Sequence, residues 1–245
     1  TQLRFPGKVL ALPDGTWLVS DSKHHSLAVL DAAADVPVRR IGTGKRGLVD
    51  GGPDEARFAE PQGLALLRPD VAAEVGFDVV VADTANHALR GVQLETGEVR
   101  TVAGTGRQWM QGSGTADLSS PWDLAWWGDR MWVAMAGIHQ LWTYEPRSGA
   151  VEVAAGTSNE GLLDGPRPES WFAQTSGLAS DGERLWLADS ETSSLRWVDD
   201  DGVHTAVGTG LFDFGFRDGP AAEALLQHPL RVTLLPDGSV AIADT

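Results

Sequence analysis

A nine-residue pattern recurs along the chain, and this repetition limits the possible folds more than any other feature. The four copies are VSDSKHHSL (19–27), VADTANHAL (81–89), VAMAGIHQL (133–141) and LADSETSSL (187–195). A short IADT at 242–245 begins a fifth copy, and the third positions of successive copies are separated by 62, 52, 54 and 55 residues. A period of this size indicates one structural unit that is stacked several times.

Each period contains four short segments with the composition of β-strands. In the first copy, PGKVLAL (6–12) and GTWLVSD (15–21) are joined by a Pro-Asp-Gly turn, and in the second copy LRGVQL (89–94) is followed by a run ending in VAGTG (102–106). Four short strands per period predict antiparallel sheets arranged as propeller blades. We therefore expect an all-β propeller in one domain, with blades at about 1–60, 61–120, 121–174 and 175–228 and an incomplete blade at 229–245.

Polar residues recur in the predicted link between the second and third strands of each blade. The third position of the pattern is Asp21, Asp83, Met135, Asp189 and Asp244, and four residues later stand His25, His87, His139 and Ser193. An active site needs one such constellation, whereas the repeat supplies several. Short polar side chains in tight turns commonly bond to backbone groups. We therefore interpret Asp21, His25, Asp83, His87, Asp189 and Asp244 as structural rather than catalytic or metal-binding.

The Asp-Ser/Thr-x-Asn-His-x-Leu-Arg pattern resembles the NHL repeat, which is named for its Asn-His-Leu signature. The chain is further similar to the propeller of the NHL repeat-containing protein 2 family and its bacterial thioredoxin-fused relatives. The matching segments are FPGKV (5–9), SSPWDL (119–124), WVAMAGIHQLW (132–142), VAAGTSNE (153–160), FAQTSGLA (172–179), ADSETSSLR (188–196) and LQHPLRVT (226–233). The resemblance implies a six-bladed propeller, usually preceded by a thioredoxin-like domain with a cysteine motif.

The chain departs from that family pattern in two respects. It contains no cysteine, so redox chemistry associated with an upstream domain is not assigned to these residues. It also contains only four complete repeats and the first two strands of a fifth. A partial ring exposes unpaired strand edges, so we expect the natural protein to continue past Thr245. If it does not, oligomerisation or strand exchange is the expected consequence.

Composition limits the partners and the location. The net charge of −15 disfavours nucleic-acid binding, which depends on clustered Lys and Arg. No signal peptide or membrane-spanning run is recognisable, and we expect a cytoplasmic protein with no membrane contact. The Gly-Thr-Gly and Asp-Gly segments lack the spacing of phosphate or calcium loops. We expect no cofactor and no bound metal.

Two groups of residues are candidates for ligand binding. In the first predicted strands, one column reads Lys8, Gly63, Asp123, Gly177 and Arg231. Lys8, Asp123 and Arg231 near a central channel could attract a small anion, or could instead form an internal ion-pair network. In the third blade, Met135 replaces the aspartate while a histidine is kept, and we expect a ligand or partner contact there. A repacked turn is the alternative. The residues of this second group are Trp122, His139, Gln140 and Trp142.

Two functions remain open from the sequence. The first is a non-enzymatic binding or scaffold propeller that contacts proteins or small ligands alongside a thioredoxin-like domain. The second is a metal-dependent hydrolase or lyase, similar to the gluconolactonase, strictosidine synthase and amidating-lyase propellers. Such enzymes need several anionic or neutral ligands that converge on a metal, and the inner column offers one carboxylate and two cations. The sequence therefore favours the scaffold without deciding against an enzyme.

Overall fold

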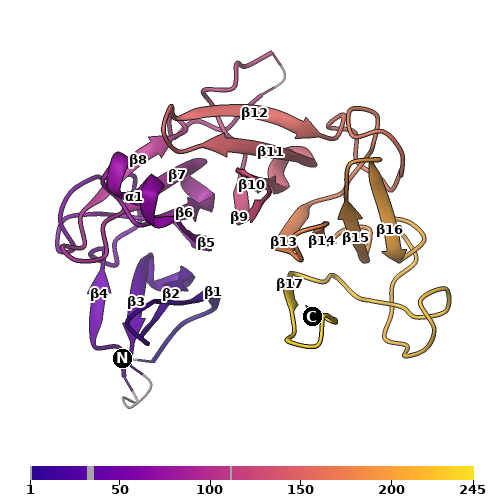
Figure 1. Ribbon diagram of the computed structural model, residues 1–245, viewed down its shortest axis with the longest axis horizontal. Helices are drawn as coiled ribbons and strands as arrows, with labels where there is room; N and C mark the ends of the chain where they lie inside the picture. Colours follow the sequence, from indigo (N-terminus) through magenta and orange to yellow (C-terminus); the bar gives the residue numbers. More distant parts are fainter. Residues whose placement is uncertain (1, 32–35, 111) are drawn as a thin grey trace. The chain divides into compact units, whose positions relative to one another are not determined.

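The computed structural model describes residues 2–31, 36–110 and 112–245. Four antiparallel sheets of four strands and one sheet of two strands follow one another along this part of the chain. In each complete sheet, neighbouring strands are consecutive in the sequence, and Figure 1 shows the strands of each blade side by side. The predicted all-β propeller architecture, with four complete blades and half a blade, is confirmed.

The chain divides into two compact units. Unit 1 contains Thr1–Pro121 and Pro146–Ala150, and unit 2 contains Trp122–Glu145 and Val151–Thr245. The first two blades lie in unit 1. Nearly all of the third blade, the fourth blade and the half blade lie in unit 2.

Unit 1 consists of two blades that pack through their apolar faces. The strands of the first are β1 (Pro6–Ala11), β2 (Trp17–Asp21), β3 (Ser26–Leu30) and β4 (Arg39–Ile41), and those of the second are β5 (Pro61–Leu66), β6 (Val79–Asp83), β7 (Ala88–Val92) and β8 (Val99–Ala103). Leu18 and Leu27 of the first blade belong to one buried cluster with Leu64 and Val81 of the second. Alternate residues of these strands therefore supply the core between blades, as a period of two requires.

A short helix, α1 (Pro69–Val75), is inserted between β5 and β6. The sequence analysis did not predict it. Its signals are a proline at the first helical position and Gly76 after the last, where φ is 74° and the amide donates to Ala72 O. Of the described helices, none has the length and apolar character required to cross a membrane.

Unit 2 repeats the same arrangement. Its strands are β9 (Pro121–Trp127), β10 (Arg130–Met135), β11 (Gln140–Glu145), β12 (Ala150–Ala155), β13 (Thr175–Ser180), β14 (Leu185–Asp189), β15 (Ser194–Val198), β16 (Val203–Val207), β17 (Arg231–Leu234) and β18 (Val240–Ala243). Trp132 and Leu141 of the third blade pack with Phe172, Leu178 and Leu187 in one buried cluster. This core occupies the apolar faces of the third and fourth blades. Polar residues can therefore be accommodated only elsewhere on these blades.

Candidate functional site

The aspartates of the repeated pattern each accept a backbone hydrogen bond from the segment that precedes their own blade. The amide of Ala59 donates to Asp83 Oδ1 at 2.7 Å, and that of Ala173 donates to Asp189 Oδ1 at 2.8 Å. The same bond joins Arg4 to Asp21 at 2.7 Å and Gln227 to Asp244 at 2.8 Å. Each donor stands four residues before its blade's position in the inner-strand column, which is Lys8, Gly63, Gly177 and Arg231 in these blades. The carboxylate therefore fixes the entry of the chain into the blade.

In the second and fourth blades, a buried arginine completes the aspartate's contacts. Arg90 Nη1 lies 2.8 Å from Asp83 Oδ2, and Arg196 Nη1 lies 3.0 Å from Asp189 Oδ2. All four side chains have no exposed surface. In the first blade, Arg40 of β4 supplies the cation instead, 2.7 Å from Asp21 Oδ2.

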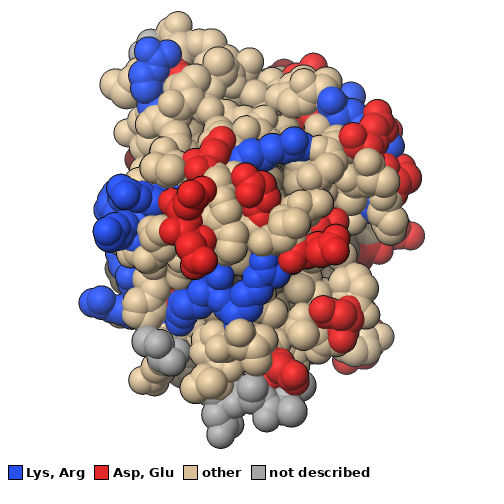
Figure 2. All heavy atoms as spheres, turned by 90° about the vertical axis from the view of Figure 1, so that its left-hand side faces the viewer, with Lys and Arg blue, Asp and Glu red and all other residues tan. Residues whose placement is uncertain are grey.

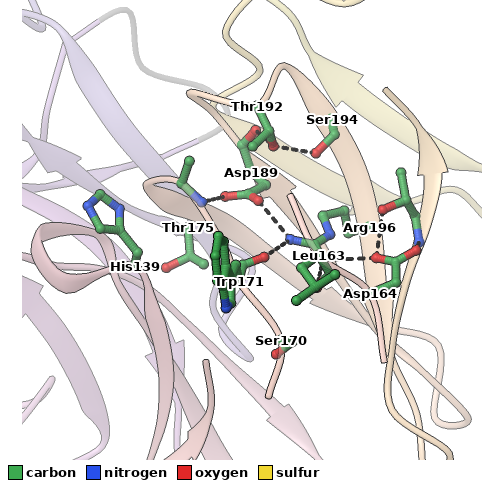
Figure 3. A network of polar contacts seen from close by, with 12 residues as sticks. His139, Leu163, Asp164, Ser170, Trp171, Thr175, Asp189, Thr192, Ser194 and Arg196 are labelled. Carbon is green, nitrogen blue, oxygen red and sulfur yellow. Dashed lines mark hydrogen bonds and ion pairs between the residues drawn. The ribbon is translucent and has the colours of Figure 1, made fainter. Parts of the chain in front are cut away.

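The same two arginines also hold the loops that precede their blades. Figure 3 shows the guanidinium of Arg196 between Asp189 and Asp164, and Nη2 lies 2.9 Å from Asp164 Oδ1. It also donates to the carbonyl oxygens of Trp171 and Leu163. Asp164 in turn accepts the amide and hydroxyl protons of Thr205. Arg90, Asp50 and Thr101 repeat this arrangement in the second blade.

Burial controls the acidity of these carboxylates. Loss of hydration raises the pKa of Asp83 to about 6 and that of Asp189 to about 6, although the adjacent arginine acts in the opposite direction. Burial also acts to raise the pKa of Asp21, but there the bonds from Arg4, His24 and Arg40 outweigh it and the pKa is lowered. The pKa of the pattern's aspartate is therefore raised in the second and fourth blades and lowered in the first.

The histidines of the pattern bond to the next blade, not to the aspartate of their own. His25 Nδ1 accepts the Glu60 amide proton at 3.2 Å, and His87 Nδ1 accepts that of Ser120 at 3.0 Å. Ser193 Oγ accepts the His228 amide proton at 3.3 Å in the fourth blade. Both partners in each bond have a left-handed backbone, with φ of 49° at His87 and 47° at Ser120. Such a conformation persists in non-glycine residues only where surrounding contacts hold it.

A hydroxyl beside Asp21, Asp83 and Asp189 makes a second bond to the following blade. Ser22, Thr84 and Ser190 donate to the carbonyl oxygens of Pro61, Pro121 and Pro229. Ala136 takes this position in the third blade and has no hydroxyl. There the next blade begins with Thr175 in place of proline, and its hydroxyl donates back to Gln140 O at 3.1 Å. A hydroxyl still links the two blades, but it now belongs to the following blade and its acceptor lies four residues beyond Ala136.

The third blade replaces the buried ion pair with apolar contacts. Met135 stands at the aspartate position and Trp142 at the arginine position, with 0% and 1% of their surfaces exposed. The Trp142 indole N–H donates to Gln140 Oε1 at 2.9 Å, and Gln140 Nε2 donates to Gly156 O at 2.8 Å. This geometry is that of a repacked turn, which the sequence analysis gave as the alternative to a ligand contact.

His139 keeps the link that the other histidines make. Its Nδ1 accepts the Gln174 amide proton at 2.9 Å. Replacement of the aspartate by Met135 therefore does not free His139, because the histidines of the pattern bond to the next blade and not to the aspartate. Trp122 differs: within the described residues, its buried indole nitrogen has no hydrogen-bond partner. The ligand-binding role of Trp122, His139, Gln140 and Trp142 stays a prediction.

The inner-strand column brings Asp123 and Arg231 together in unit 2. Asp123 is 1% exposed and accepts the amide protons of Leu124 at 2.8 Å and Leu178 at 2.9 Å. Arg231 Nη1 lies 3.6 Å from Asp123 Oδ2. Lys8 lies in unit 1, where its amide donates to Ser20 Oγ. Asp123 thereby joins the third blade to the fourth, and the anion site stays a prediction.

Gly177 of the same column is required by a close approach of two strands. A Cβ atom at Gly177 would lie 2.5 Å from the Cα atom of Arg231. β13 and β17 therefore pass one another too closely for any side chain at this point. Glycine at this position has a packing explanation.

Each unit also has hollows that open to solvent. In unit 1, a hollow of about 470 Å³ lies between α1 and the end of β5, and one of about 240 Å³ adjoins it through Pro13 and Leu94. In unit 2, a hollow of about 490 Å³ is lined by Trp127, Trp132 and charged residues. Among the described residues, no three His, Asp or Glu side chains gather as a metal site would require.

The charged surface is mixed in sign where it can be seen. Figure 2 shows the face that includes the outer edges of β4 and β8, with groups of Lys and Arg next to groups of Asp and Glu. Interspersed charges of this kind keep a protein surface solvated. This face therefore offers no large region of a single charge.

Sequence reasoning missed the arginines and the loop aspartates as one network. The signal was present, since an arginine follows the pattern's aspartate by seven residues at Asp83 and Asp189. The Asp-Gly segments at Asp50 and Asp164 were considered as calcium loops, whose spacing they lack. Their partnership with these arginines depends on strand packing that no local pattern reveals.

Comparisons with known proteins agree with this geometry. No protein-family model matches the chain. It is 37% identical to the protein SUPPRESSOR OF QUENCHING 1, chloroplastic, of Arabidopsis thaliana, over 99% of this chain and 24% of that protein. It is 36% identical to NHL repeat-containing protein 2 of Gallus gallus, over 94% of this chain and 36% of that protein. The chain thus spans about a quarter to a third of the length of these relatives.

A solved structure of a provisionally assigned gluconolactonase superimposes with a TM-score of 0.61 at 12% identity, over 99% of this chain and 72% of the other. This likeness concerns the fold alone. The sequence relatives show that the chain belongs to the NHL-repeat β-propellers and resembles the propeller of NHL repeat-containing protein 2.

Proposed function

We propose that this chain is a non-enzymatic binding or scaffold propeller. It holds a protein partner or a small ligand alongside a thioredoxin-like domain that lies outside the chain. The presence of that domain is an expectation from the family resemblance. A binding role fits a fold whose repeated polar residues stabilise the blades themselves.

The observation that carries this proposal is the internal use of the repeat's reactive groups. Asp83, Asp189, Arg90 and Arg196 are wholly buried and bonded to one another or to backbone. The imidazoles of His25, His87 and His139 accept backbone amide protons through Nδ1. Solvent instead reaches hollows with apolar or aromatic walls, which suit contact with a partner.

The hollow beside α1 supplies a testable contact surface. Pro69, Ala72, Ala73 and Gly76 line it at helical spacing, so one face of α1 points into the hollow. On its other side, Arg147 binds the carboxylates of Asp70 and Glu74 at 2.9 and 2.6 Å. The helix is therefore anchored while its small apolar residues face solvent.

The experiment is a calorimetric titration of the chain with a separately expressed thioredoxin-like domain from a two-domain relative. We expect saturable binding that Ala73→Arg abolishes and Ala221→Arg retains. Ala221 is an exposed alanine in unit 2, so it provides the same substitution away from the hollow. Absence of binding at millimolar domain would contradict the scaffold proposal. Saturable hydrolysis of a lactone by the purified chain would contradict the non-enzymatic one.

A further inference from the structure

The hollow of unit 2 has an aromatic floor. It lies between the turn that joins β9 to β10 and the turn that joins β13 to β14, and we call it the Trp127 hollow. The rings of Trp127 and Trp132 have centroids 5.1 Å apart and are tilted by 51°. Trp132 is 4% exposed, and Trp127 is partly buried against the same core. The floor is therefore contiguous with the core of unit 2.

One guanidinium already lies on this floor. Arg167 Cζ is 5.1 Å from the Trp127 centroid and 5.8 Å from the Trp132 centroid. Arg167 Nε donates to Asp199 O at 3.0 Å, and Nη2 lies 3.3 Å from Asp200 Oδ1. The site thus shows the chemistry that recognises a planar cation: indole faces, a carbonyl oxygen and a carboxylate.

The rim of the hollow is negatively charged. Asp129, Glu183 and Asp200 line it together with two arginines, Arg130 and Arg167. Three negative charges against two positive ones leave −1, and Arg130 additionally faces Glu152 at 3.6 Å. The whole chain carries −15. A cation approaching the hollow is attracted both by the rim and by the overall field.

We propose that the Trp127 hollow binds the guanidinium or alkylammonium group of a basic peptide segment. Glu183 acts as its counter-charge at the rim, and the indole of Trp127 provides an apolar wall for the side-chain methylenes. Arg130 and Arg167 oppose this binding, so it is weak for a single side chain and depends on salt. The inference rests on the proposed binding function and names the partner's chemistry at one site.

The test uses the peptide Ac-Gly-Arg-Gly-NH2 with the full chain. Binding is followed through the indole N–H resonances of tryptophan in 15N-labelled protein. The citrulline peptide has nearly the same shape without the charge, and we expect it to bind about tenfold or more weakly. Raising NaCl from 20 to 300 mM should lower the affinity for the arginine peptide severalfold. A lysine peptide tests the alkylammonium group. Glucose is the uncharged control and should not shift the indole N–H resonances.

Matched variants locate the site. Glu183→Gln should lower the affinity for the arginine peptide about three- to tenfold, because it removes one counter-charge. Asp201→Asn removes another exposed carboxylate, one outside the lining, and should leave affinity unchanged. Trp127→Leu should abolish binding, with thermal unfolding used to confirm that the variant is folded.

Three results would overturn the inference. They are equal affinities for the citrulline and arginine peptides, equal effects of Glu183→Gln and Asp201→Asn on affinity, or resonance shifts that glucose causes and the arginine peptide does not. Binding of the thioredoxin-like domain is measured separately, through the hollow beside α1. Failure of the peptide with retained domain binding therefore removes only this site and leaves the proposed function standing.

Discussion

Met135 occupies the position in the third blade that Asp83 occupies in the second, and both side chains have no exposed surface. Trp142 likewise stands in for Arg90. One chain thus contains an ionic and an apolar solution to the same packing problem. A buried ion pair and a well-packed apolar pair can have similar net stability, whereas half of an ion pair is strongly unfavourable. The two positions are therefore expected to change together.

The first prediction concerns the pair in the second blade. Asp83→Ala removes the buried one of the two carboxylates that Arg90 contacts and leaves the guanidinium only the half-exposed Asp50. The Ala59 amide also loses its acceptor, and we expect a loss of about 3 kcal/mol or more in the free energy of unfolding. Chemical denaturation measures it. The double variant Asp83→Ala/Arg90→Ala should be destabilised by much less than the sum of the single variants.

The third blade supplies the reverse control for this prediction. Met135→Asp introduces a buried carboxylate where Trp142 takes the place of the arginine, so we expect destabilisation of similar size. An Asp83→Ala variant with the denaturation midpoint of the wild-type chain would show that the carboxylate does not hold the blade.

The second prediction is a pH dependence. The pKa of Asp83 is raised by burial to about 6 in the folded chain, from an ordinary value of 3.8. The folded state therefore binds the proton more tightly, and this contribution to stability is lost as pH rises from about 4 through about 6. Asp83→Asn cannot ionise. The stability of the wild type relative to Asp83→Asn should fall across this window and stay constant above it.

Urea denaturation of both proteins between pH 4 and 8 measures that difference. Groups common to both chains, including the histidines, cancel. A difference that grows in favour of the wild type as pH rises would contradict this prediction. It would mean that Arg90 lowers the pKa of Asp83 by more than burial raises it.

The third prediction concerns the link from His87 to Ser120. Burial lowers the pKa of His87 below 6.5, and its Nδ1 must be unprotonated to accept the amide proton. Stability from this link is therefore present above pH 6.5 and lost as pH falls below it. His87→Asn should retain much of the stability at pH 8, because asparagine tolerates the left-handed backbone and its Oδ1 can replace Nδ1. His87→Ala should lose about 1–3 kcal/mol.

The same urea titration, run for His87→Asn, checks the sign. Relative to this variant, the wild type should become less stable as pH falls below 6.5. A flat difference would show that protonation of His87 does not break the link.

The sequence was sufficient for the blades because strands, turns and the repeat all carry local signals. Column positions such as Asp83 and His87 were recognised for the same reason. Their partners were not, since Arg90 reaches Asp50 only through packing across 40 residues of sequence. The Trp127 hollow depends on two turns from different blades, and α1 was missed because the strand pattern around it dominated the interpretation. Local chemistry could be predicted, whereas contacts between blades required the fold.

The last prediction separates the two interpretations of the inner column. Asp123 Oδ2 lies 3.6 Å from Arg231 Nη1, so we expect the carboxylate to neutralise the guanidinium and leave no phosphate-dependent stabilisation in the wild type. Asp123→Asn removes that charge while its amide oxygen can still accept one backbone proton, so phosphate should stabilise this variant. At about 100 times the dissociation constant the gain should reach about 2.7 kcal/mol, and adding Arg231→Gln should cancel it. Thermal unfolding in 0–20 mM phosphate at constant ionic strength measures each protein. A rise in the wild type that Arg231→Gln abolishes would instead support the anion site, because the field of Arg231 would then exceed that of its neighbour.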